Sequence, residues 1–379
     1  MMHFLLAFWD YVIVFLAILT VVVFVHEMGH FLVARWNGVK VEVFSIGFGP
    51  ELFGRTARSG TRWRVSLLPF GGYVKMFGDA DAASTPDTNS RYTADERKLA
   101  LQFKPVQQRA AIVAAGPLAN FLFGIVALAV LLVVYGEPRT APVIGQVQPD
   151  SAAAEAGLLV GDRVTGANGE TVNSFQDLQR IVRMTAEEPV SLTLLRDGQQ
   201  LTMIVHPQVT AIKDLFGNVV KTPVLGVVAD PTATELVRFN AATALVEATR
   251  QTAGMVSNTM TGLGQMIAGR RDSSQISGPL RIAKFAGQSA QLGIGGLANF
   301  VIVLSINLGL INLFPVPLLD GGHLLFYAIE AVRGRPLGAR AQEYGFRIGL
   351  FLVFALMLFA TRNDLVDLRV WEFIKGIIS

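Results

Sequence analysis

Long apolar runs alternate with polar stretches along the chain, and this pattern predicts the architecture. Four runs stay apolar for about the length that the hydrocarbon core of a bilayer requires. They cover residues 11–34, 110–134, 296–318 and 345–361. We therefore expect a polytopic α-helical membrane protein with about four transmembrane helices.

The segment between the first two apolar runs has a different period. Hydrophobic residues alternate with other residues over 41–48, Ser59-Gly60 supplies a turn, and the alternation resumes over 63–67. Period-two alternation on both sides of a turn predicts a β-hairpin. Since its neighbours are membrane helices, we expect this hairpin to associate with the membrane and to offer an edge strand to a substrate. A hairpin surrounded by solvent is the alternative.

A small β-rich domain is predicted after the second apolar run. Ala156-Gly157-Leu158, Gly161-Asp162-Arg163-Val164 and the turn Asn168-Gly169 precede a helical stretch near 175–184. This order resembles a PDZ domain, which implies recognition of an extended peptide or a C-terminal carboxylate by strand addition. A β-rich spacer without a ligand is the alternative. The strand expected beside the peptide supplies three candidate substrate-binding residues, Val143, Ile144 and Gly145.

Composition agrees with the membrane class and narrows the chemistry. Of 379 residues, 51% are hydrophobic and only 16% are charged, which is too apolar for an ordinary soluble protein. The chain has no cysteine, so disulfides, thiolate metal sites and thiol nucleophiles are excluded. Its basic residues form no recognisable nucleic-acid motif. Any metal must therefore be held by histidine and carboxylate.

The distribution of basic residues predicts an orientation. Lysine and arginine are frequent in the loop 35–109 and absent before the first helix, which places that loop in the cytoplasm. Alternation then sends 135–295 outside and returns 319–344, with its three arginines, to the cytoplasm. The C-terminus is expected outside.

Candidate chemistry is concentrated near the end of the first apolar run, in His26-Glu27-Met28-Gly29-His30. Two imidazoles four residues apart on a helix share one face and reach one metal ion. With a carboxylate as third ligand, such a zinc set leaves one position for water, and Glu27 can take the proton from that water. Ionisable residues are costly inside a membrane, so three together favour a function over an accident.

Two carboxylates are candidates for the third ligand. Glu51 follows His30 at a separation like that in thermolysin-type proteases, but the intervening segment is rich in turn formers and β-formers and does not predict a helix. Asp320 is the stronger candidate, because the topology brings it and the histidines to the same side of the membrane. Pro315 and Pro317 are expected to break the third helix just before it, which implies a water-accessible site.

The motifs together resemble the site-two protease family, in its bacterial branch typified by the regulator of sigma-E protease. The resemblance is carried by HEMGH, by GPLAN at 116–120, by the single PDZ-like module and by NLFPVPLLDGG at 312–322. It implies an intramembrane zinc metalloendopeptidase with one Zn²⁺. The residues it implies are His26, His30 and Asp320 as zinc ligands, Glu27 as catalytic acid and base, and Asn312 and Asn120 as substrate-binding residues.

The family also implies a biological setting. Its bacterial members cut transmembrane segments of single-span proteins, such as anti-sigma factors first cut by another protease, and remnant signal peptides form a further expected class. The expected location is the bacterial inner membrane, with the active site toward the cytoplasm and the PDZ-like domain in the periplasm. Two other functions are alternatives: a membrane-anchored zincin that acts on soluble proteins through Glu51, and a non-catalytic PDZ scaffold or metal carrier.

These expectations divide the chain into nine segments. In order they are the first transmembrane helix (1–36), a cytoplasmic loop with the hairpin (37–109), the second helix (110–135), the PDZ-like domain (139–209), a helical region (210–295), the third helix with Asp320 (296–320), a cytoplasmic segment (321–344), the fourth helix (345–361) and a tail (362–379). This chain differs from the best-known members of the family in the number of PDZ modules. Those members carry two, whereas residues 139–209 have room for one. A gating scheme that needs two modules is therefore not expected here.

Overall fold

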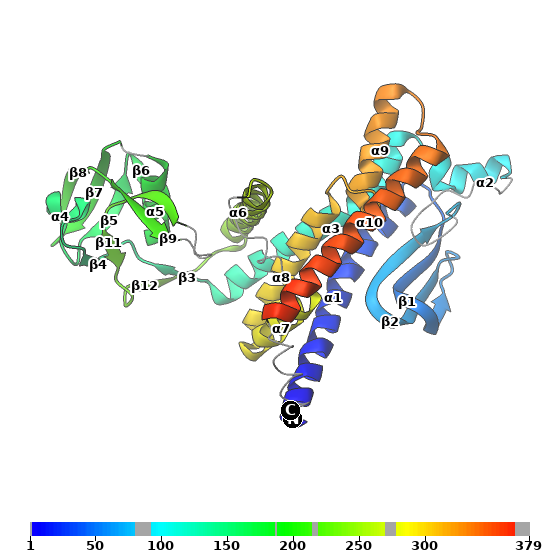
Figure 1. Cartoon of the computed structure of the whole chain (residues 1–379), viewed down its shortest axis with the longest axis horizontal. Helices are drawn as coiled ribbons and strands as arrows, with labels where there is room; N and C mark the ends of the chain where they lie inside the picture. Colours follow the sequence, from blue (N-terminus) through cyan, green and yellow to red (C-terminus); the bar gives the residue numbers. More distant parts are fainter. Residues whose placement is uncertain (1, 80–91, 186–187, 214–218, 270–277, 368–379) are drawn as a thin grey trace. The chain divides into compact units, whose positions relative to one another are not determined.

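The computed structural model describes residues 2–79, 92–185, 188–213, 219–269 and 278–367 (Figure 1). The chain divides into two compact units. We call the first the membrane unit, and it comprises Met1–Ala129, Leu245–Leu263 and Ser273–Ser379. The second, the β-rich unit, comprises Val130–Ala244 and Gly264–Asp272. Each is described by itself.

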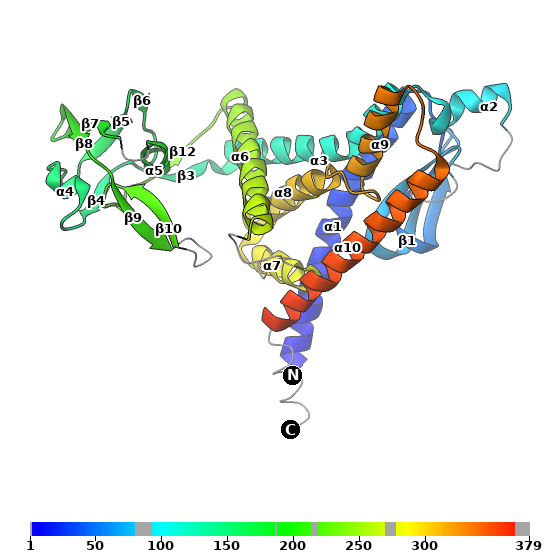
Figure 2. The same cartoon turned by 45° about the horizontal axis from the view of Figure 1, so that its top comes forward.

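Among the residues described, four helices are long and apolar enough to cross a bilayer. They are α1 (Met2–Trp36), α3 (Val106–Tyr135), α8 (Gly293–Asn312) and α10 (Ala339–Asp367). Each covers most of one predicted apolar run, so the prediction of a polytopic membrane protein is confirmed. A shorter helix, α7 (Pro279–Gln291), packs against α1, α8 and α10 (Figure 2).

Small residues let α1, α3 and α8 approach closely. A Cβ placed on Gly29 of α1 would lie 2.3 Å from the carbonyl oxygen of Ala115 on α3. A Cβ on Gly124 of α3 would lie 2.7 Å from Cγ1 of Ile306 on α8. Because lipid chains are as apolar as leucine, close van der Waals packing at small residues is a main source of helix association in membranes. The three helices therefore form a tightly packed support for the side chains described below.

The third transmembrane helix ends earlier than expected. Helix α8 stops at Asn312, and Asp320 is the first residue of a separate helix, α9 (Asp320–Arg333). The predicted helix over 296–320 is therefore wrong at its end, whereas the predicted break at Pro315 and Pro317 is confirmed. Proline lacks the N–H that would continue the helical hydrogen bonds.

Two further predicted boundaries differ in the same region. Helix α9 occupies most of the segment predicted as 321–344, and α10 extends beyond the predicted 345–361 at both ends. Of the predicted tail, 362–367 belongs to α10, and the remainder lies outside the described residues.

The predicted hairpin is confirmed as β1 (Val41–Thr56) and β2 (Arg62–Met76). Residues 43–46 pair with 72–75 and also with 62–65, so the long hairpin folds back on itself. Phe44 and Val74 pack with Phe31 of α1, which anchors the hairpin to that helix. The remainder of this loop includes α2 (Ala94–Leu99) and the short 3-10 helix η1 (Leu101–Phe103), and residues 80–91 lie outside the described part.

Apolar side chains cover the exposed part of the hairpin. Phe53 is 75% exposed and Phe70 is 59% exposed, and further exposed apolar residues are Phe48, Leu52, Val65, Leu67 and Leu68. A concentration of large exposed apolar residues on one element is typical of contact with a membrane or a partner. It supports the membrane-associated hairpin over one surrounded by solvent.

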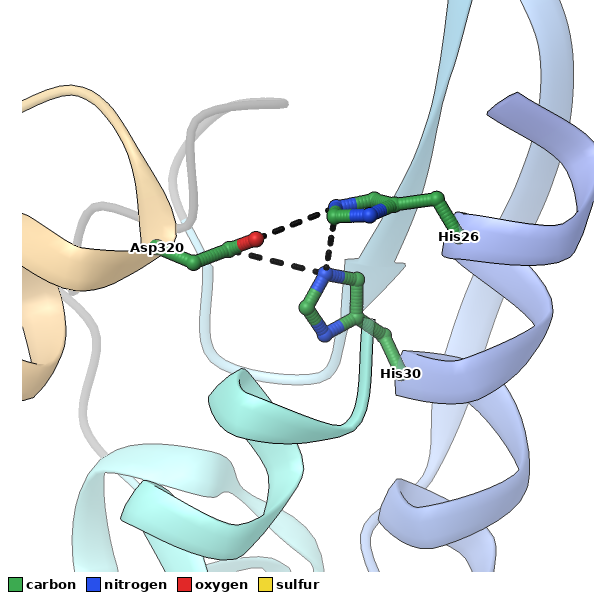
Figure 3. A group of neighbouring side chains, drawn as sticks. All are labelled: His26, His30 and Asp320. Carbon is green, nitrogen blue, oxygen red and sulfur yellow. Dashed lines mark hydrogen bonds and ion pairs between the residues drawn. The ribbon is translucent and has the colours of Figure 1, made fainter. Parts of the chain in front are cut away.

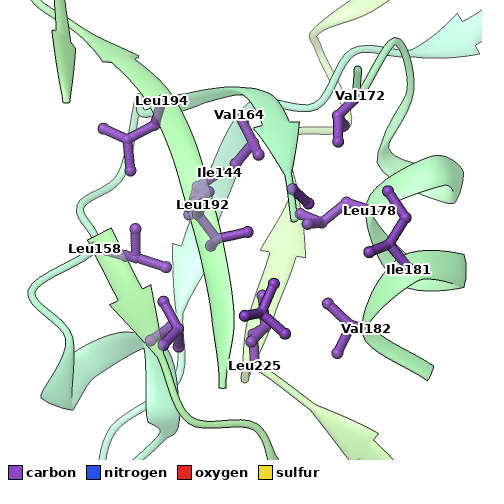
Figure 4. Close-up of a cluster of buried hydrophobic side chains, with 14 of the residues drawn as sticks. Ile144, Leu158, Val164, Val172, Leu178, Ile181, Val182, Leu192, Leu194 and Leu225 are labelled. Carbon is purple, nitrogen blue, oxygen red and sulfur yellow. The ribbon is translucent and has the colours of Figure 1, made fainter. Parts of the chain in front are cut away.

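The β-rich unit has a PDZ-like core (Figure 4). A four-stranded sheet has the order β6-β5-β7-β8, and Leu178 and Ile181 of a helix pack on buried strand residues such as Val164 and Leu192. Asn168 and Gly169 both have positive φ, of 50° and 80°, as the predicted tight turn requires. The elements are β4 (Ile144–Val147), α4 (Ala152–Glu155), β5 (Arg163–Ala167), β6 (Glu170–Thr171), α5 (Phe175–Met184), β7 (Val190–Arg196) and β8 (Gln199–Val205).

The predicted boundary of this domain at residue 209 comes too early. Strand β11 (Val227–Ala229) pairs with β4, and Leu225 belongs to the buried core. The segment predicted as helical from residue 210 instead begins with strands, and its first helix is α6 (Ala241–Ile267). The other strands here are β9 (Gln208–Lys213), β10 (Val219–Val224) and β12 (Thr234–Val237), and β12 pairs with β3 (Glu137–Thr140). Because β11 and β12 pair with strands distant in sequence, local pattern does not predict them.

A buried ion pair makes the stability of the β-rich unit depend on pH. Asp162 is 1% exposed, and its carboxylate accepts hydrogen bonds from Arg196 Nε at 2.6 Å and from the Leu159 N–H at 2.9 Å. Burial alone would raise the pKa of this carboxyl, but the two donors outweigh it and hold the pKa below its usual range. The folded state therefore favours the ionised form, and this stabilisation is present above about pH 4 and is lost as the pH falls below it.

We expect Asp162→Ala to destabilise the β-rich unit by about 3 kcal/mol near neutral pH. Hydrogen exchange of peptides from β5 and β7 in the full chain, corrected for intrinsic rates, measures the change. The wild-type protein should lose protection between about pH 5 and pH 3, on either side of the ordinary carboxyl pKa, and the variant should show a smaller loss over that range. Equal pH dependence in both proteins would contradict the assignment.

Candidate active site

Helix α1 brings His26 and His30 onto one face, as the spacing predicts. Their rings lie edge to face with centroids 4.8 Å apart, and their Nε2 atoms are separated by 3.2 Å. Both are buried, with 7% and 9% of their surface exposed. In Figure 3 they project from successive turns of α1 toward Asp320, which reaches in from α9.

Asp320 completes the group from the far end of the chain. Its Oδ2 lies 3.0 Å from His26 Nε2, and its Oδ1 lies 3.5 Å from His30 Nε2. Within the described part of the chain, these three residues form the group with the spacing of a metal site. Glu51 lies on β1, where its Oε2 accepts a hydrogen bond from Arg62 Nε at 2.9 Å. The structure therefore brings Asp320, and not Glu51, to the histidines.

Helix α3 shapes the space behind His30. The Nδ1 atom of His30 lies 2.9 Å from the carbonyl oxygen of Ile112. A carbonyl only accepts, so Nδ1 carries the proton and Nε2 keeps its lone pair for a ligand. One turn further along α3, a Cβ on Gly116 would lie 2.3 Å from His30 Nε2 and 2.9 Å from His26 Cε1. Only glycine leaves room for both rings at this position.

His26, His30 and Asp320 bring their nitrogen and oxygen atoms to about the spacing of a tetrahedral zinc site. Zinc ligands at about 2.0–2.1 Å in tetrahedral geometry lie roughly 3.3 Å from one another. The two Nε2 atoms are 3.2 Å apart, Asp320 Oδ2 lies 3.0 Å from His26 Nε2, and Asp320 Oδ1 lies 3.5 Å from His30 Nε2, all close to that value. Among the described residues, Asp320 Oδ2 is a buried atom without a hydrogen-bond partner. The lone pairs of His26 Nε2, His30 Nε2 and the Asp320 carboxylate point toward one another. Burying them together is unfavourable unless a cation lies between them.

A cavity of about 210 Å³ opens beside the group. Glu27 and Asn312 line it, together with Gly72, Tyr73 and Val74 from β2. Val74 and Glu27 thus line the same space. The stretch 72–75 pairs with β1 on one side, so its other side faces the cavity as a strand edge. The Glu27 carboxylate, the group of His26, His30 and Asp320, and a strand edge thus surround one space.

The remaining predicted residues of the membrane unit divide into two groups. Asn312 lines the cavity with its Nδ2 atom 3.5 Å from His26 Nε2, where it is available to a substrate carbonyl. Asn120 is fully buried behind His26, with Nδ2 3.2 Å from His26 Nδ1. Asn120 is not among the residues that line the cavity, so its predicted role as a substrate contact stays a prediction without support from this geometry. His323 lines the cavity but does not belong to the ligand group.

The predicted peptide-binding strand of the β-rich unit is wrong. Ile144 donates its N–H to the Asp162 carbonyl and accepts from the Gly161 N–H, while β4 pairs with β11 on its other side. A Cβ on Gly145 would lie 2.6 Å from the Asp230 Cα, and Val143 accepts a hydrogen bond from the Asp230 N–H. Both sides of this strand are occupied, so no edge is left at 143–145 for a peptide.

A groove in the same unit lies elsewhere. It has a volume of about 400 Å³ and lies between α5 and the segment 223–227. Phe175, Leu178 and Val182 of α5 line it, together with the polar side chains of Gln179 and Arg183. Sequence analysis does not reveal this groove, because it predicts a helical region where 223–227 forms short strands.

Comparison with known proteins agrees with this geometry. The family model "Peptidase family M50" matches residues 14–356. The chain belongs to peptidase family M50. This is the site-two protease family, whose members are zinc metalloproteases that act by intramembrane proteolysis. The predicted metalloprotease class and the zinc cofactor are therefore confirmed.

Relatives match the M50 chain over nearly its whole length. A protein of Agrobacterium fabrum named "Putative zinc metalloprotease Atu1380" is 45% identical, over 94% of this chain and 96% of its own. Metalloprotease MmpA of Caulobacter vibrioides is 37% identical, over 96% of this chain and 97% of its own. The PDZ domain of the SdrC-like protein from Listeria monocytogenes aligns with 24% of this chain and 87% of its own, at 19% identity and a TM-score of 0.20.

Gly116 opens the GPLAN run, but the sequence does not show why a glycine is needed there. The structure shows that its missing Cβ leaves room for the two histidine rings. We expect Gly116→Ala to abolish tight zinc binding, because the added methyl carbon would overlap His30 Nε2. Gly254→Ala on α6 is the matched control, since a Cβ there meets no atom within 4 Å. Zinc content after purification measures both. Full zinc occupancy in Gly116→Ala would contradict the site geometry.

Proposed function

We propose that this M50 protein hydrolyses peptide bonds within transmembrane segments of single-span membrane proteins. The proposed substrates are of the anti-sigma-factor type, first cut by another protease, with remnant signal peptides as a further class. The observation that carries the proposal is the meeting of His26, His30 and Asp320 at a cavity among apolar helices, with Glu27 beside them.

His26, His30 and Asp320 are the proposed zinc ligands and Glu27 the proposed catalytic residue. A zinc ion held there supplies Lewis acidity to the attacking water and to the scissile carbonyl. Glu27 takes the proton from the attacking water and later returns it to the leaving amine. Asn312 donates a hydrogen bond to the carbonyl oxygen as negative charge develops on it.

The strand edge of β2 offers a way to hold a substrate. A helical backbone engages its carbonyls in internal hydrogen bonds, so a transmembrane segment must unwind locally before it is cut. An unwound segment can then pair with 72–75 by strand addition. Val74 lines the cavity together with Glu27, and we propose that pairing with this strand brings the scissile bond to the Glu27 carboxylate.

The location that we propose is the bacterial inner membrane. The basic loop 35–109 and the arginines of 319–344 support a cytoplasmic position for the active site, and alternation then places the β-rich unit in the periplasm. We propose that an extended peptide or a C-terminus binds in the groove between α5 and 223–227 instead of at the strand 143–145. Its apolar lining and the nearby Arg183 suit such a ligand.

Reconstitution in lipid vesicles tests the proposed function. A single-span protein with a truncated outer domain is incorporated together with wild-type protein or with Glu27→Gln. We expect cleavage by the wild type only, at a bond that mass spectrometry places within the apolar segment. Cleavage of a soluble protein such as casein, with the membrane segment left intact, would favour a membrane-anchored zincin instead. Equal cleavage by both proteins would exclude Glu27 as the catalytic residue.

A further inference from the structure

Asn120 is a buried polar residue at the contact of three helices. It is 0% exposed on α3, and its side chain faces His26 of α1. On the α8 side, Ser305 Oγ donates a hydrogen bond to the Asn120 carbonyl at 3.1 Å, and a Cβ on Gly309 would lie 3.2 Å from the Asn120 Cβ. Asn120 is thus packed between α1, which carries His26, and α8.

The donors and acceptors of His26 determine which end of the Asn120 side-chain amide faces it. His26 Nε2 points at Asp320 and at His30 Nε2, so this nitrogen must keep its lone pair if His26 is to bind a metal. A neutral imidazole then carries its proton on Nδ1. The atom opposite Nδ1 must therefore accept, and the amide oxygen of Asn120 is the acceptor within reach.

A second observation agrees with this orientation. With the amide nitrogen toward His26, Asn120 Oδ1 is a buried atom that has no partner among the residues described. The two ends of an amide are interchanged by a simple rotation, and their assignment rests on the hydrogen-bond network. Rotation places Oδ1 opposite Nδ1 at about the 3.2 Å that now separates Nδ2 from it. This gives Oδ1 a donor and the Nδ1 proton an acceptor, and it moves Nδ2 to the place where Oδ1 now has no partner.

We propose that Asn120 is a positioning residue that accepts the Nδ1 proton of His26 and so presents Nε2 to zinc. The proposal rests on the proposed role of His26 as a ligand. Helix α3 then orients both imidazoles, since its Ile112 carbonyl accepts the proton of His30 Nδ1. Partners of this kind fix the tautomer and the ring direction of a ligating histidine, and their loss typically lowers metal affinity by about 10–100-fold.

Zinc affinity in the purified, detergent-solubilised full chain tests the proposal. Asn120→Leu keeps the approximate shape of the side chain but offers no acceptor, and we expect zinc to bind about 10–100-fold more weakly in chelator competition. Asn120→Asp keeps an acceptor, and its affinity should stay within a few-fold of wild type. Asn307→Leu is the matched control, because Asn307 lies on α8 and bonds to Val303 O, outside the site.

The absorption spectrum of the cobalt-substituted variants reports the geometry around the metal. A residue that only supports the fold would leave this spectrum unchanged. We expect Asn120→Asp to keep the wild-type cobalt spectrum and Asn120→Leu to change it. Wild-type zinc affinity in Asn120→Leu would overturn the proposal. If Asn120→Leu does not fold, a loss of affinity in folded Asn120→Asp as large as about 10-fold overturns it equally. Both measurements need no substrate, so a protein that binds zinc as expected but fails to cut membrane segments would contradict the proposed function alone.

Discussion

Replacing Glu27 with glutamine is expected to slow peptide hydrolysis by a factor of about 10²–10⁴, the contribution of a positioned acid and base. Glutamine has nearly the same shape as glutamate and keeps a side-chain oxygen that can accept a hydrogen bond. It cannot take a proton from water. The loss should therefore appear in kcat, measured on a vesicle-reconstituted single-span substrate, with zinc content unchanged.

A carboxylate elsewhere in the membrane unit provides the control for Glu27→Gln. Glu42 lies on β1 with its Oε2 atom 3.4 Å from Lys75 Nζ, outside the residues that line the cavity. Glu42→Gln should keep wild-type kcat. A Glu27→Gln protein that keeps more than about a tenth of wild-type activity with full zinc would show that another group transfers the proton.

The parts of the site that sequence predicts are those determined by local spacing. Two histidines four residues apart on a helix must share a face, so spacing alone pairs His26 with His30. Predicting Asp320 as their partner requires one further step. The first and third transmembrane helices cross the membrane in the same direction, so their C-terminal ends lie on the same side. The geometry agrees, with Asp320 Oδ2 3.0 Å from His26 Nε2.

The parts that sequence does not predict depend on contacts between distant segments. Whether Asn120 faces the cavity or the back of His26 depends on how α3 is rotated against α1, and apolar helices with little amphipathic pattern do not reveal this rotation. Strand β11 completes the PDZ-like core by pairing with β4, which lies far earlier in sequence, and local patterns contain no information on such pairs.

Tertiary context also explains the error at Asp320. Leu313 to Leu319 are all apolar or proline and continue the hydropathy of α8, so the apolar run extends in sequence up to the acid. The prolines instead form a loop, and Asp320 starts a new helix whose first turn bears a negative charge, as the dipole of a helix N-terminus favours. This geometry lets the carboxylate approach from a helix whose direction is independent of α8.

The choice between Asp320 and Glu51 leads to the other large expected effect. Asp320→Ala should weaken zinc binding by more than the roughly 10–100-fold that loss of an outer partner costs, because it removes a proposed direct ligand and its charge. Proteolysis should be lost with the metal. Chelator competition on the purified protein measures the affinity without any substrate.

Glu51→Ala is the matched substitution, since it removes the competing carboxylate from a hairpin position where Glu51 pairs with Arg62. We expect its zinc affinity to equal that of wild type, because Glu51 does not belong to the ligand group. Retained zinc in Asp320→Ala together with loss in Glu51→Ala would reverse the assignment and favour a thermolysin-like ligand order. Loss of zinc in both variants would mean that the hairpin itself holds the site together, with Glu51 acting through the position of β2 against α1.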